Sequence, residues 1–443
     1  MGELENSEEF VKWFRHSSPY INAHRGRTFV ILFDGEAVDD NDFQDLINDI
    51  ALLNSLGIKL VLVHGARAQI EQNLKISGID TQIVEHTRVT TSEALHVVKQ
   101  SVGAIKMQIE AMLSMGIANS PMAGARIRVI SGNFVTAKPV GVVNGVDFCF
   151  TGHVRRIDAN SITDHLNDAS IVLLSSIGYS PTGEIFSLTA EEVATQTAIA
   201  LKADKLIYLG NGNHIKTPEG QLISQLTLSD ARNWLNSYGH NIDWQFAQSL
   251  QSAIDVCARG VKRAHIINRH VCGALLMELF SRNGIGTMVS GDLYDNTRQA
   301  TIDDIGGILE LIQPLEADGS LVKRSREKLE TEISYFTVIE LDGMVIGCAA
   351  LYPYEADNIA ELACLAIDKD FRNENRGNLL LKMLENEAKK KNIHKIFVLT
   401  AKTAHWFVER GFVEATLKEL PMDKQNMYNF QRKSKVFIKQ LSE

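Results

Sequence analysis

The segment AIDKDFRNENRGNLLLKML (366–384) has a residue pattern that suits the binding of a phosphate group. It begins apolar, becomes polar and charged, and ends with leucines at helical spacing, which predicts a strand, a tight loop and a helix start. Free N–H groups at a helix N-terminus, helped by the helix dipole, can hold a pyrophosphate. Such loops usually contain two or three glycines, whereas this one contains only Gly377. These residues alone leave two interpretations, a phosphate site or an ordinary turn.

The composition limits the class of protein. A chain of 443 residues with 45% hydrophobic residues predicts about two or three globular domains. The net charge of -9 argues against a nucleic-acid partner, because phosphate backbones need a basic face. The five cysteines form no C-x-x-C pair, which predicts reduced thiols and no metal site. The acidic N-terminus and the lack of long apolar runs predict a cytoplasmic protein with no membrane partner.

The elements that must position this segment follow from hydrophobic periodicity. Continuous apolar runs such as TFVILF (28–33) and IKLVLVHG (58–65) alternate with helical patterns such as residues 92–116. This alternation predicts an α/β fold whose mainly parallel sheet is sandwiched by helices. A short helix is expected over residues 10–20, ending near Pro19.

A polar, turn-rich stretch, SGDLYDNTR (290–298), predicts a domain boundary. We therefore expect one domain over residues 1–293 and a second over residues 294–443. The second domain has a different pattern, with a hairpin at 336–351, a strand at 360–367 before the loop and a last strand near 434–439.

The order of elements in the second domain resembles the GCN5-related N-acetyltransferase (GNAT) fold, and HWFVERGF (405–412) is similar to a helical motif of that family. In that family a loop of pattern Q/R-x-x-G-x-G/A binds the pyrophosphate of acetyl-CoA. Arg372 and Gly377 fit this pattern. Asn375 stands where the pattern has a glycine, and asparagine can adopt the left-handed backbone conformation that such a loop needs. We therefore prefer the phosphate-site interpretation. The resemblance implies acetyl-CoA contacts at Cys364, Leu365, Arg372, Asn373, Glu374, Asn375, Arg376, Gly377 and Asn378.

A more specific resemblance extends over the whole chain. PLEADGSLVKRSREKLE, GCAALYPY, AELACLAI and RKSKV look like the corresponding segments of the bacterial N-acetylglutamate synthases. Members of that family transfer the acetyl group of acetyl-CoA to L-glutamate in the first step of arginine biosynthesis, and L-arginine inhibits them by feedback. The resemblance implies the same reaction, without a metal, for this chain.

Glu361 and Thr400 are the candidate catalytic residues that the resemblance implies. The amine must lose a proton before it attacks the thioester, and a carboxylate such as Glu361 can accept that proton. The Thr400 hydroxyl can support the leaving thiolate. By residue type alone, Glu361 is a solvated strand-end residue and Thr400 an ordinary β-branched strand residue. Strand amides near Cys364 can bind the thioester oxygen, while its side chain is expected to be a small buried group rather than a nucleophile.

Arg324 and Arg432 occupy positions that bind glutamate in the family. Guanidinium groups hold carboxylates with two hydrogen bonds, so paired arginines favour a dicarboxylate acceptor. Without the resemblance, each would be interpreted as a surface charge, as we interpret Arg326.

The first domain resembles the amino acid kinase family, most clearly in ARGVKRAHIINRHVCGALLMELFSRNGIGTMV (258–289). Its phosphate-handling positions depart from that family. Leu32 replaces a lysine, Asp34 replaces a glycine, and HGARA (64–68) replaces a glycine-rich loop. A carboxylate repels ATP phosphates, so we expect a domain that does not phosphorylate.

Arginine-sensitive relatives bind L-arginine in this domain, and a carboxylate such as Glu278 suits a guanidinium. By residue type alone, Glu278 is a surface helix residue and His265 a core histidine. The family resemblance also implies a homo-oligomer, with a hexamer as one form. The positions that match the arginine site are Tyr20, Lys205, His265, Glu278 and Thr287.

Three other functions remain open from the sequence. The chain could be an active acetylglutamate kinase with an accessory transferase domain, against which Leu32 argues. It could be an arginine-sensing regulatory protein whose transferase domain is inactive, an alternative that Asn375 supports. It could also acetylate a different amine.

Overall fold

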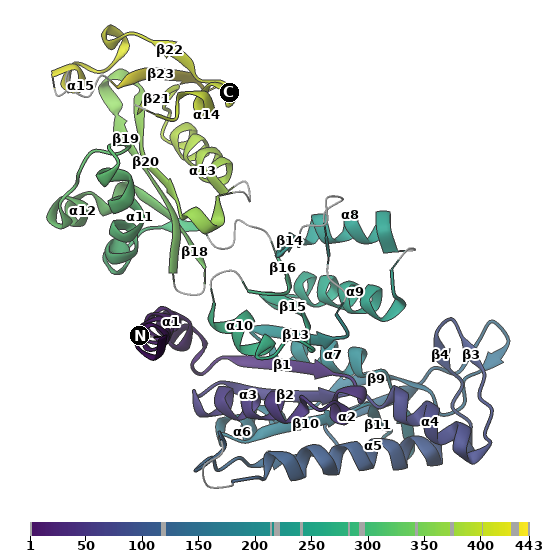
Figure 1. The fold of residues 1–443 in the computed structure, drawn as a ribbon. Helices are drawn as coiled ribbons and strands as arrows, with labels where there is room; N and C mark the ends of the chain where they lie inside the picture. The colour runs from purple at the N-terminus through teal and green to yellow at the C-terminus, as the bar shows by residue number, and fades with distance from the viewer. Residues whose placement is uncertain are drawn as a thin grey trace. The chain divides into compact units, whose positions relative to one another are not determined.

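The computed structural model describes residues 2–116, 121–212, 215–216, 222–239, 242–281, 284–291, 297–341, 344–372, 376–400, 402–426 and 434–441. The chain forms two compact units, Met1–Asp292 and Leu293–Glu443 (Figure 1). Each unit has its own sheet.

An eight-stranded sheet forms the centre of the first unit among its described residues. Neighbouring strands are parallel except for β15 and β16, which confirms the expected mainly parallel sheet. The strands lie in the order β14 (Gln225–Thr227), β16 (Thr287–Ser290), β15 (Arg263–Asn268), β13 (Lys205–Gly210), β1 (Thr28–Phe33), β2 (Lys59–His64), β10 (Ile171–Ser175) and β5 (Val129–Ile130).

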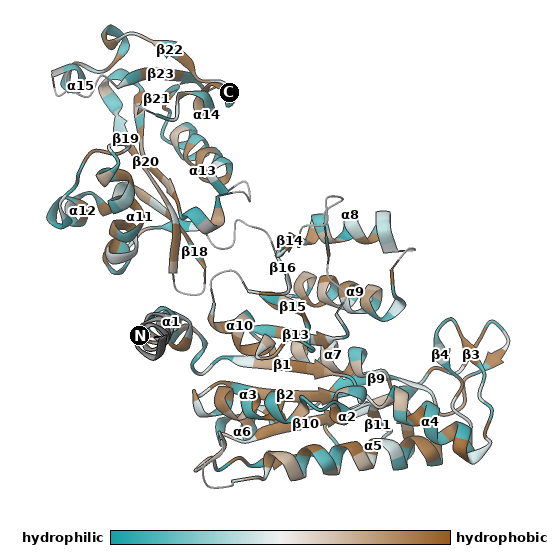
Figure 2. Ribbon diagram, in the orientation of Figure 1, coloured by the Kyte–Doolittle hydropathy of each residue, from teal (hydrophilic) through white to brown (hydrophobic). Residues whose placement is uncertain are grey.

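Helices cover both faces of this sheet. One face packs against α6 (Ala159–Asn167), α7 (Ala190–Leu201) and α9 (Trp244–Ala258), and the other against α3 (Phe43–Ser55), α5 (Ser92–Leu113) and α10 (Ala274–Phe280). Strands covered on both faces must be apolar throughout. Figure 2 shows mostly hydrophobic residues along β1 and β2, in which every residue after the first is buried. The remaining helices of this unit include α2 (Glu36–Asp39), α4 (Arg67–Ser77) and α8 (Leu228–Tyr238).

A smaller sheet accompanies the main one, and the sequence pattern predicts one of its strands, near residues 134–138. Its order is β12 (Ile185–Ser187), β11 (Ile177–Tyr179), β6 (Val135–Pro139) and β9 (Gly152–Ile157). β11 and β12 are three residues long, and β9 is half exposed, so none of these strands has a long apolar run.

The N-terminal helix is longer than the sequence predicted. α1 extends from Gly2 to His24 and continues through Pro19, where we expected it to end. Packing against α10 compensates for the hydrogen bond that the proline removes. The Ser17 hydroxyl donates to the Phe280 carbonyl (3.3 Å), and His24 Nε2 lies 2.9 Å from the Leu279 carbonyl.

A seven-stranded sheet forms the second unit among its described residues. All neighbours are antiparallel except β20 and β21. The order is β17 (Thr297–Gln299), β18 (Phe336–Leu341), β19 (Met344–Tyr354), β20 (Ile359–Ile367), β21 (Lys395–Thr400), β23 (Lys435–Gln440) and β22 (Val413–Ala415). The helices are α11 (Ile305–Ala317), α12 (Arg326–Glu332), α13 (Arg376–Lys390), α14 (Ala404–Val408) and α15 (Met422–Asn426).

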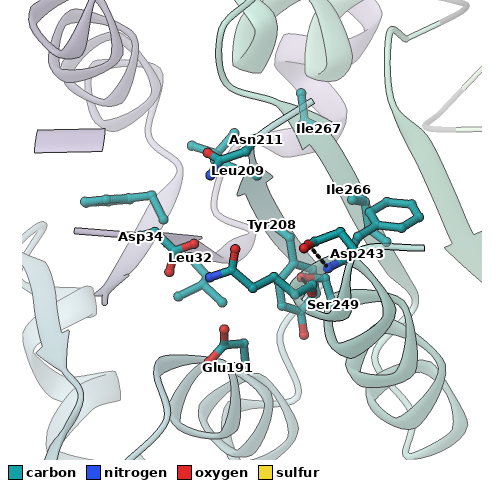
Figure 3. A pocket seen from close by; sticks show the side chains of 14 residues that line it. Leu32, Asp34, Glu191, Tyr208, Leu209, Asn211, Asp243, Ser249, Ile266 and Ile267 are labelled. Atoms are coloured by element: carbon teal, nitrogen blue, oxygen red, sulfur yellow. Dashed lines mark hydrogen bonds between the residues drawn. The ribbon is translucent and has the colours of Figure 1, made fainter. Parts of the chain in front are cut away.

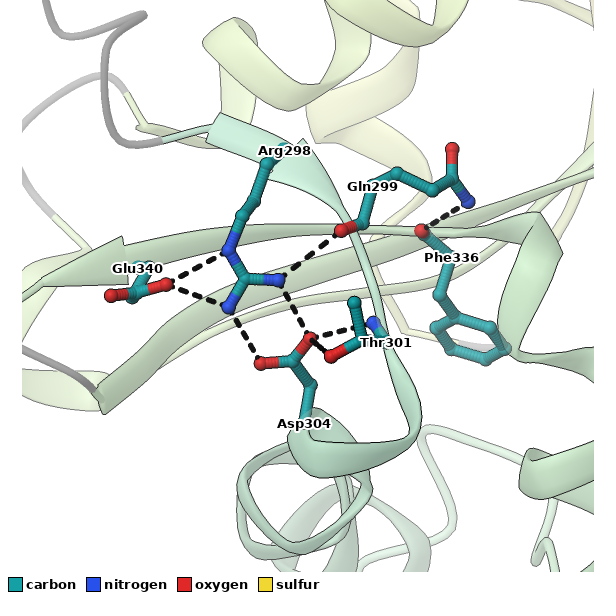
Figure 4. Close-up of polar contacts among 6 residues, drawn as sticks. All are labelled: Arg298, Gln299, Thr301, Asp304, Phe336 and Glu340. Atoms are coloured by element: carbon teal, nitrogen blue, oxygen red, sulfur yellow. Dashed lines mark hydrogen bonds and ion pairs between the residues drawn. The ribbon is translucent and has the colours of Figure 1, made fainter.

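The edge strand β17 is held by an ionic network (Figure 4). The Arg298 guanidinium donates two hydrogen bonds to Asp304 (2.7 and 2.8 Å) and two to Glu340 Oε2 (2.8 and 2.6 Å). Asp304 also accepts the backbone N–H of Thr301 (2.7 Å). Hydrogen bonds from Arg298 hold the pKa of Asp304 below its usual value. The network therefore joins β17 to β18 and to the turn that precedes α11.

No described helix is long and apolar enough to cross a membrane. All five cysteines lie in described parts of the chain, and they form no disulfide. Cys257, Cys348 and Cys364 are buried, whereas Cys149 and Cys272 are exposed.

Candidate active site

The parallel strands β20 and β21 separate at Glu361. Their register pairs Ile359 with Lys395 and continues only as far as Glu361 and Phe397, although both strands extend further. The Glu361 residue is 7% exposed, so it is not a solvated strand-end residue. Its Oε2 lies 2.6 Å from Nζ of Lys424 on α15. A buried carboxylate thus lies where the two central strands part.

A second polar group adjoins Glu361. Tyr352 is its direct partner in the β19/β20 register, so both side chains point to the same face of the sheet. The Tyr352 hydroxyl donates to Glu332 Oε2 (2.7 Å). Burial, followed by the hydrogen bond to Glu332, raises the pKa of Tyr352.

Arg324, in the segment before α12, lies near Tyr352. Its guanidinium lies within hydrogen-bonding reach of Tyr352 and close to Cys364. Its Nε is buried without a hydrogen-bond partner among the described residues. An unsatisfied buried donor is costly, so this nitrogen fits an acceptor supplied by a ligand. Its glutamate-binding partner in the prediction, Arg432, lies outside the described residues.

Cys364 forms a β-bulge. Cys348 pairs with Ala366 and Ala350 with Ala363, so Cys364 and Leu365 together oppose Ala349. Cys364 has a φ of 52°, a left-handed value that re-aims the backbone at this point. Burial raises the pKa of its thiol to about 11, so the side chain is a neutral buried thiol at neutral pH. This agrees with the expectation that the side chain is a small buried group.

Thr400 ends β21 and is buried. Its Oγ1 accepts the backbone N–H of Thr403 (3.1 Å) and lies 2.9 Å from the Thr403 hydroxyl. The Thr400 oxygen accepts the hydrogen bond from the Thr403 N–H, so the Thr400 hydroxyl proton remains free to be donated, either to the Thr403 hydroxyl or to a ligand.

The helix that follows the candidate phosphate loop, α13, begins at Arg376. Arg376 is 2% exposed, and its guanidinium carbon lies 4.9 Å from the centroid of the Phe371 ring, so its side chain is turned inward. Arg372 is exposed, with Nε 3.3 Å from the Ile367 carbonyl. Three predicted loop residues, Asn373, Glu374 and Asn375, lie outside the described residues.

Sequence reasoning missed the residues that surround Glu361 and Arg324. Lys424 forms an ion pair with Glu361, Tyr352 lies opposite Glu361 in the sheet, and Glu332 accepts a hydrogen bond from Tyr352. The register of β19 with β20 brings Tyr352 opposite Glu361, and no local motif marks such a pairing.

The first unit retains a cleft at the carboxyl ends of its parallel strands. A cavity of about 50 Å³ is lined by Leu32, Asp34, Glu191 and Asn211, among others (Figure 3). This volume is far below the ~300 Å³ at which ligand pockets begin. Burial, followed by the charges of Glu191 and Glu36, raises the pKa of Asp34 to about 6. A larger cavity of about 500 Å³ adjoins it and is lined by Asp34, Arg67, Arg88 and Glu191, among others.

The five predicted arginine-site residues belong to neighbouring elements of the first unit. Lys205 begins β13, Thr287 begins β16, and Tyr20 lies on α1, which packs against the helix that carries Glu278. Tyr20, Lys205, His265 and Thr287 are buried. The side chain of Glu278 is 4% exposed, so Glu278 is not a surface helix residue. His265 Nδ1 lies 2.7 Å from Glu278 Oε1.

The charge states of this pair follow from their partners. Burial alone would raise the pKa of Glu278. The hydrogen bond from His265 and those from the N–H groups of Gly286 (2.9 Å) and Ile285 (2.7 Å) outweigh burial and lower this pKa to about 2. Burial lowers the pKa of His265. The pair is therefore a carboxylate and a neutral imidazole that donates from Nδ1. His265 Nε2 is then a buried acceptor without a partner among the described residues.

The two units match two family models. The model described as "Amino acid kinase family" matches residues 27–268, and the model described as "Acetyltransferase (GNAT) family" matches residues 307–412. The fold and the site thus define an acetyltransferase that consists of an amino acid kinase-like unit followed by a GNAT unit. GNAT enzymes use acetyl-CoA, which is therefore the acetyl donor.

Full-length relatives narrow the class. The amino-acid acetyltransferases of Yersinia enterocolitica serotype O:8 / biotype 1B and Yersinia pseudotuberculosis serotype O:1b are each 48% identical over 439 residues, which cover 99% of this chain and 100% of the relative. The N-acetylglutamate synthase of Neisseria gonorrhoeae complexed with coenzyme A and L-arginine is 34% identical, with a TM-score of 0.84, over 98% of this chain and 100% of that chain. The complex of that enzyme with coenzyme A and N-acetyl-glutamate is 35% identical, with a TM-score of 0.62 over the same shares. The chain belongs to the N-acetylglutamate synthase family of amino-acid acetyltransferases.

Proposed function

We propose that this chain is an acetyl-CoA:L-glutamate N-acetyltransferase that makes N-acetyl-L-glutamate, the first step of arginine biosynthesis, and that L-arginine inhibits it. The observation that carries the proposal is the position of Glu361. It is a buried carboxylate at the point where β20 and β21 separate, beside a group that includes Arg324. A base next to a guanidinium suits an acceptor that has both an amine and carboxylates.

The reaction needs an acceptor for each of the two protons that the substrate nitrogen loses, and one oxyanion site. Glu361 accepts a proton from the α-ammonium of glutamate, directly or through a water. The free amine then attacks the thioester carbon, forming a C–N bond while negative charge builds on the carbonyl oxygen. Backbone N–H groups at the Cys364 bulge are proposed to stabilise that charge. When the C–S bond breaks, the thiolate leaves with the electron pair and takes up the second proton that the nitrogen loses, which gives free coenzyme A. The Thr400 hydroxyl donates a hydrogen bond to the leaving sulfur.

Substrate binding follows from the charges. Arg324 offers a buried Nε to a glutamate carboxylate, and Arg432 is proposed to hold the other carboxylate. The loop 372–378 and the first turn of α13 are proposed to bind the donor pyrophosphate through backbone N–H groups. The Neisseria enzyme, whose complexes contain coenzyme A with L-arginine or N-acetyl-glutamate, supports these ligands.

The arginine site is proposed to lie around Lys205, His265 and Glu278. A guanidinium is a pure donor, and His265 Nε2 is a buried acceptor without a described partner. The carboxylate of Glu278 supplies the opposite charge, while the ammonium of Lys205 suits the carboxylate of the ligand. Inhibition then requires a coupling free energy between this site and the transferase site.

The kinase-like unit is proposed to be catalytically silent, and the protein to act as a cytoplasmic homo-oligomer. Leu32 places an aliphatic side chain where a kinase needs a cation, and Asp34 and Glu191 line the cavity beside it. Calorimetry with Mg-ATP should detect no binding, whereas saturable binding would revive the kinase alternative.

The deciding experiment measures thiol release from acetyl-CoA with glutamate, with aspartate and without an amine, each with and without arginine. Release that depends on glutamate and is suppressed by arginine is the expected result. Release that ignores arginine would remove the sensor from the proposal. Release with neither amine would favour an arginine-sensing protein whose transferase unit is inactive.

A further inference from the structure

Arg410, just after α14, contacts the first turn of α13. Its Nε donates a hydrogen bond to the side-chain oxygen of Asn378, and Nη1 donates to the Trp406 carbonyl (2.7 Å). Its guanidinium carbon lies 3.9 Å from the centroid of the Trp406 ring. Arg410 therefore ties the helix that starts at the candidate phosphate loop to the segment that ends in Gly411.

Trp406 also lies against the first turn of α13. A Cβ built on Gly377 would lie 3.1 Å from Cζ2 of Trp406, closer than most real contacts. The indole therefore covers Gly377, and Arg410 stacks on that indole. Two side chains of one short segment thus fix the position of the first turn of α13.

The positive charge of Arg410 lies at the N-terminus of α13, where a cation is not expected. A cation near a helix N-terminus is unfavourable, because the free N–H groups already carry partial positive charge. The carboxylate found near Arg410 is that of Glu409 (3.2 Å), which is 68% exposed and gives little stabilisation. Arg410 Nη2 makes no hydrogen bond to a described residue. A cation with a free donor edge at this helix end fits an anionic ligand.

We propose that Arg410 is a positioning residue for the phosphate groups of the acetyl donor. It fixes the first turn of α13 through Asn378 and Trp406, and it adds one positive charge to the phosphate site. This inference rests on the proposed role of the loop 372–378 in binding acetyl-CoA. The base and the glutamate-binding group do not depend on it.

The test compares two donors, acetyl-CoA and acetyl-pantetheine, which has the same thioester but lacks the nucleotide phosphates. Arg410→Gln should lower kcat/KM for acetyl-CoA by about ten- to a hundredfold, the usual effect of a charge-assisted hydrogen bond. The same variant should leave kcat/KM for acetyl-pantetheine and KM for glutamate unchanged. Arg410→Lys should give an intermediate loss, because it keeps the charge but loses the planar fork. The matched control is Lys391→Gln at the far end of α13, which should match the wild type.

Equal losses with both donors would show a purely structural role, and no loss with acetyl-CoA would remove Arg410 from the site. Gly377→Val tests the loop separately, since a larger side chain there clashes with Trp406. If Gly377→Val binds coenzyme A normally, the loop assignment fails and Arg410 fails with it. If the wild type does not acetylate glutamate, calorimetric coenzyme A binding by Arg410→Gln still decides the inference independently of the acceptor.

Discussion

The carboxylate of Glu361 and the ammonium of Lys424 form an ion pair in which Oε2 and Nζ are 2.6 Å apart. The pair joins the central strand β20 to the short helix α15, and little of the Glu361 side chain is exposed. An ionised carboxylate is the form that accepts a proton. The ammonium of the incoming substrate must therefore approach a group that already has a positively charged neighbour.

Glu361→Gln should lower kcat by about 10²- to 10⁴-fold, the range that a positioned general base contributes. The amide is isosteric but does not accept a proton at neutral pH. Coenzyme A affinity should stay unchanged, because Glu361 lies on β20 before the bulge and not in the loop. Steady-state thiol release and calorimetry measure the two quantities, and full turnover would remove Glu361 as the base.

Lys424→Met tests whether Glu361 acts as the base or only holds α15 in place through its ion pair with Lys424. If Glu361 served only to hold Lys424, losing either partner would reduce kcat equally. We expect Lys424→Met to keep kcat at saturating glutamate within about tenfold of the wild type. Equal losses in Glu361→Gln and Lys424→Met would contradict the proposed base.

Arg324→Ala should raise KM for glutamate by about ten- to a hundredfold, because a buried guanidinium–carboxylate contact is lost. The effect on kcat at saturating glutamate should be smaller. Arg326→Ala is the matched control, since Arg326 is two residues away, 74% exposed, and paired only with Glu330 among described carboxylates. A KM for glutamate that stays at the wild-type value in Arg324→Ala would exclude Arg324 from the acceptor site.

The main sheets were predictable from the sequence, whereas most strands of the small sheet were not. β1 and β2 are covered on both faces, so their apolar runs are unbroken and identify them. β11 and β12 are three residues long and become strands only through tertiary pairing. The end of α1 was mispredicted at Pro19, because contacts of Ser17 and His24 with α10 override the local preference.

The candidate site was predictable only in part. The resemblance to known families pointed to Glu361 and Arg324, whose residue types alone suggested solvated charges. The burial of Glu361 and its contact with Lys424 depend on how distant segments pack. Tyr352 faces Glu361 through a register that includes a bulge, which the local pattern does not specify.

Glu278→Gln should weaken arginine inhibition at least about tenfold, because the amide loses the charge that attracts a guanidinium. Turnover without arginine should be retained, since Glu278 belongs to the first unit. Inhibition curves and calorimetry with L-arginine measure the change. Glu93→Gln, the same substitution at an exposed helix position, should keep the wild-type response. Wild-type arginine affinity in Glu278→Gln would place the arginine site elsewhere.

Asp34→Asn should stabilise the first unit at neutral pH. The pKa of Asp34 is about 6 in the folded chain against an ordinary value of 3.8, with burial as the main cause. Below pH 3.8 the carboxyl is protonated in both states and does not affect the free energy of unfolding. As the pH rises from 3.8 to about 6, the unfolded chain ionises first, so the folded state becomes relatively less stable, and the cost is complete above pH 6. Removing the charge should therefore raise the free energy of unfolding by about 1–3 kcal/mol at pH 7–8 and change it little near pH 4.

Chemical unfolding followed by tryptophan fluorescence measures this stability. The signal reports mainly on the first unit, because three of the four tryptophans, Trp13, Trp234 and Trp244, belong to it. A lower stability of Asp34→Asn at pH 7 would mean that the carboxylate makes a stabilising contact instead.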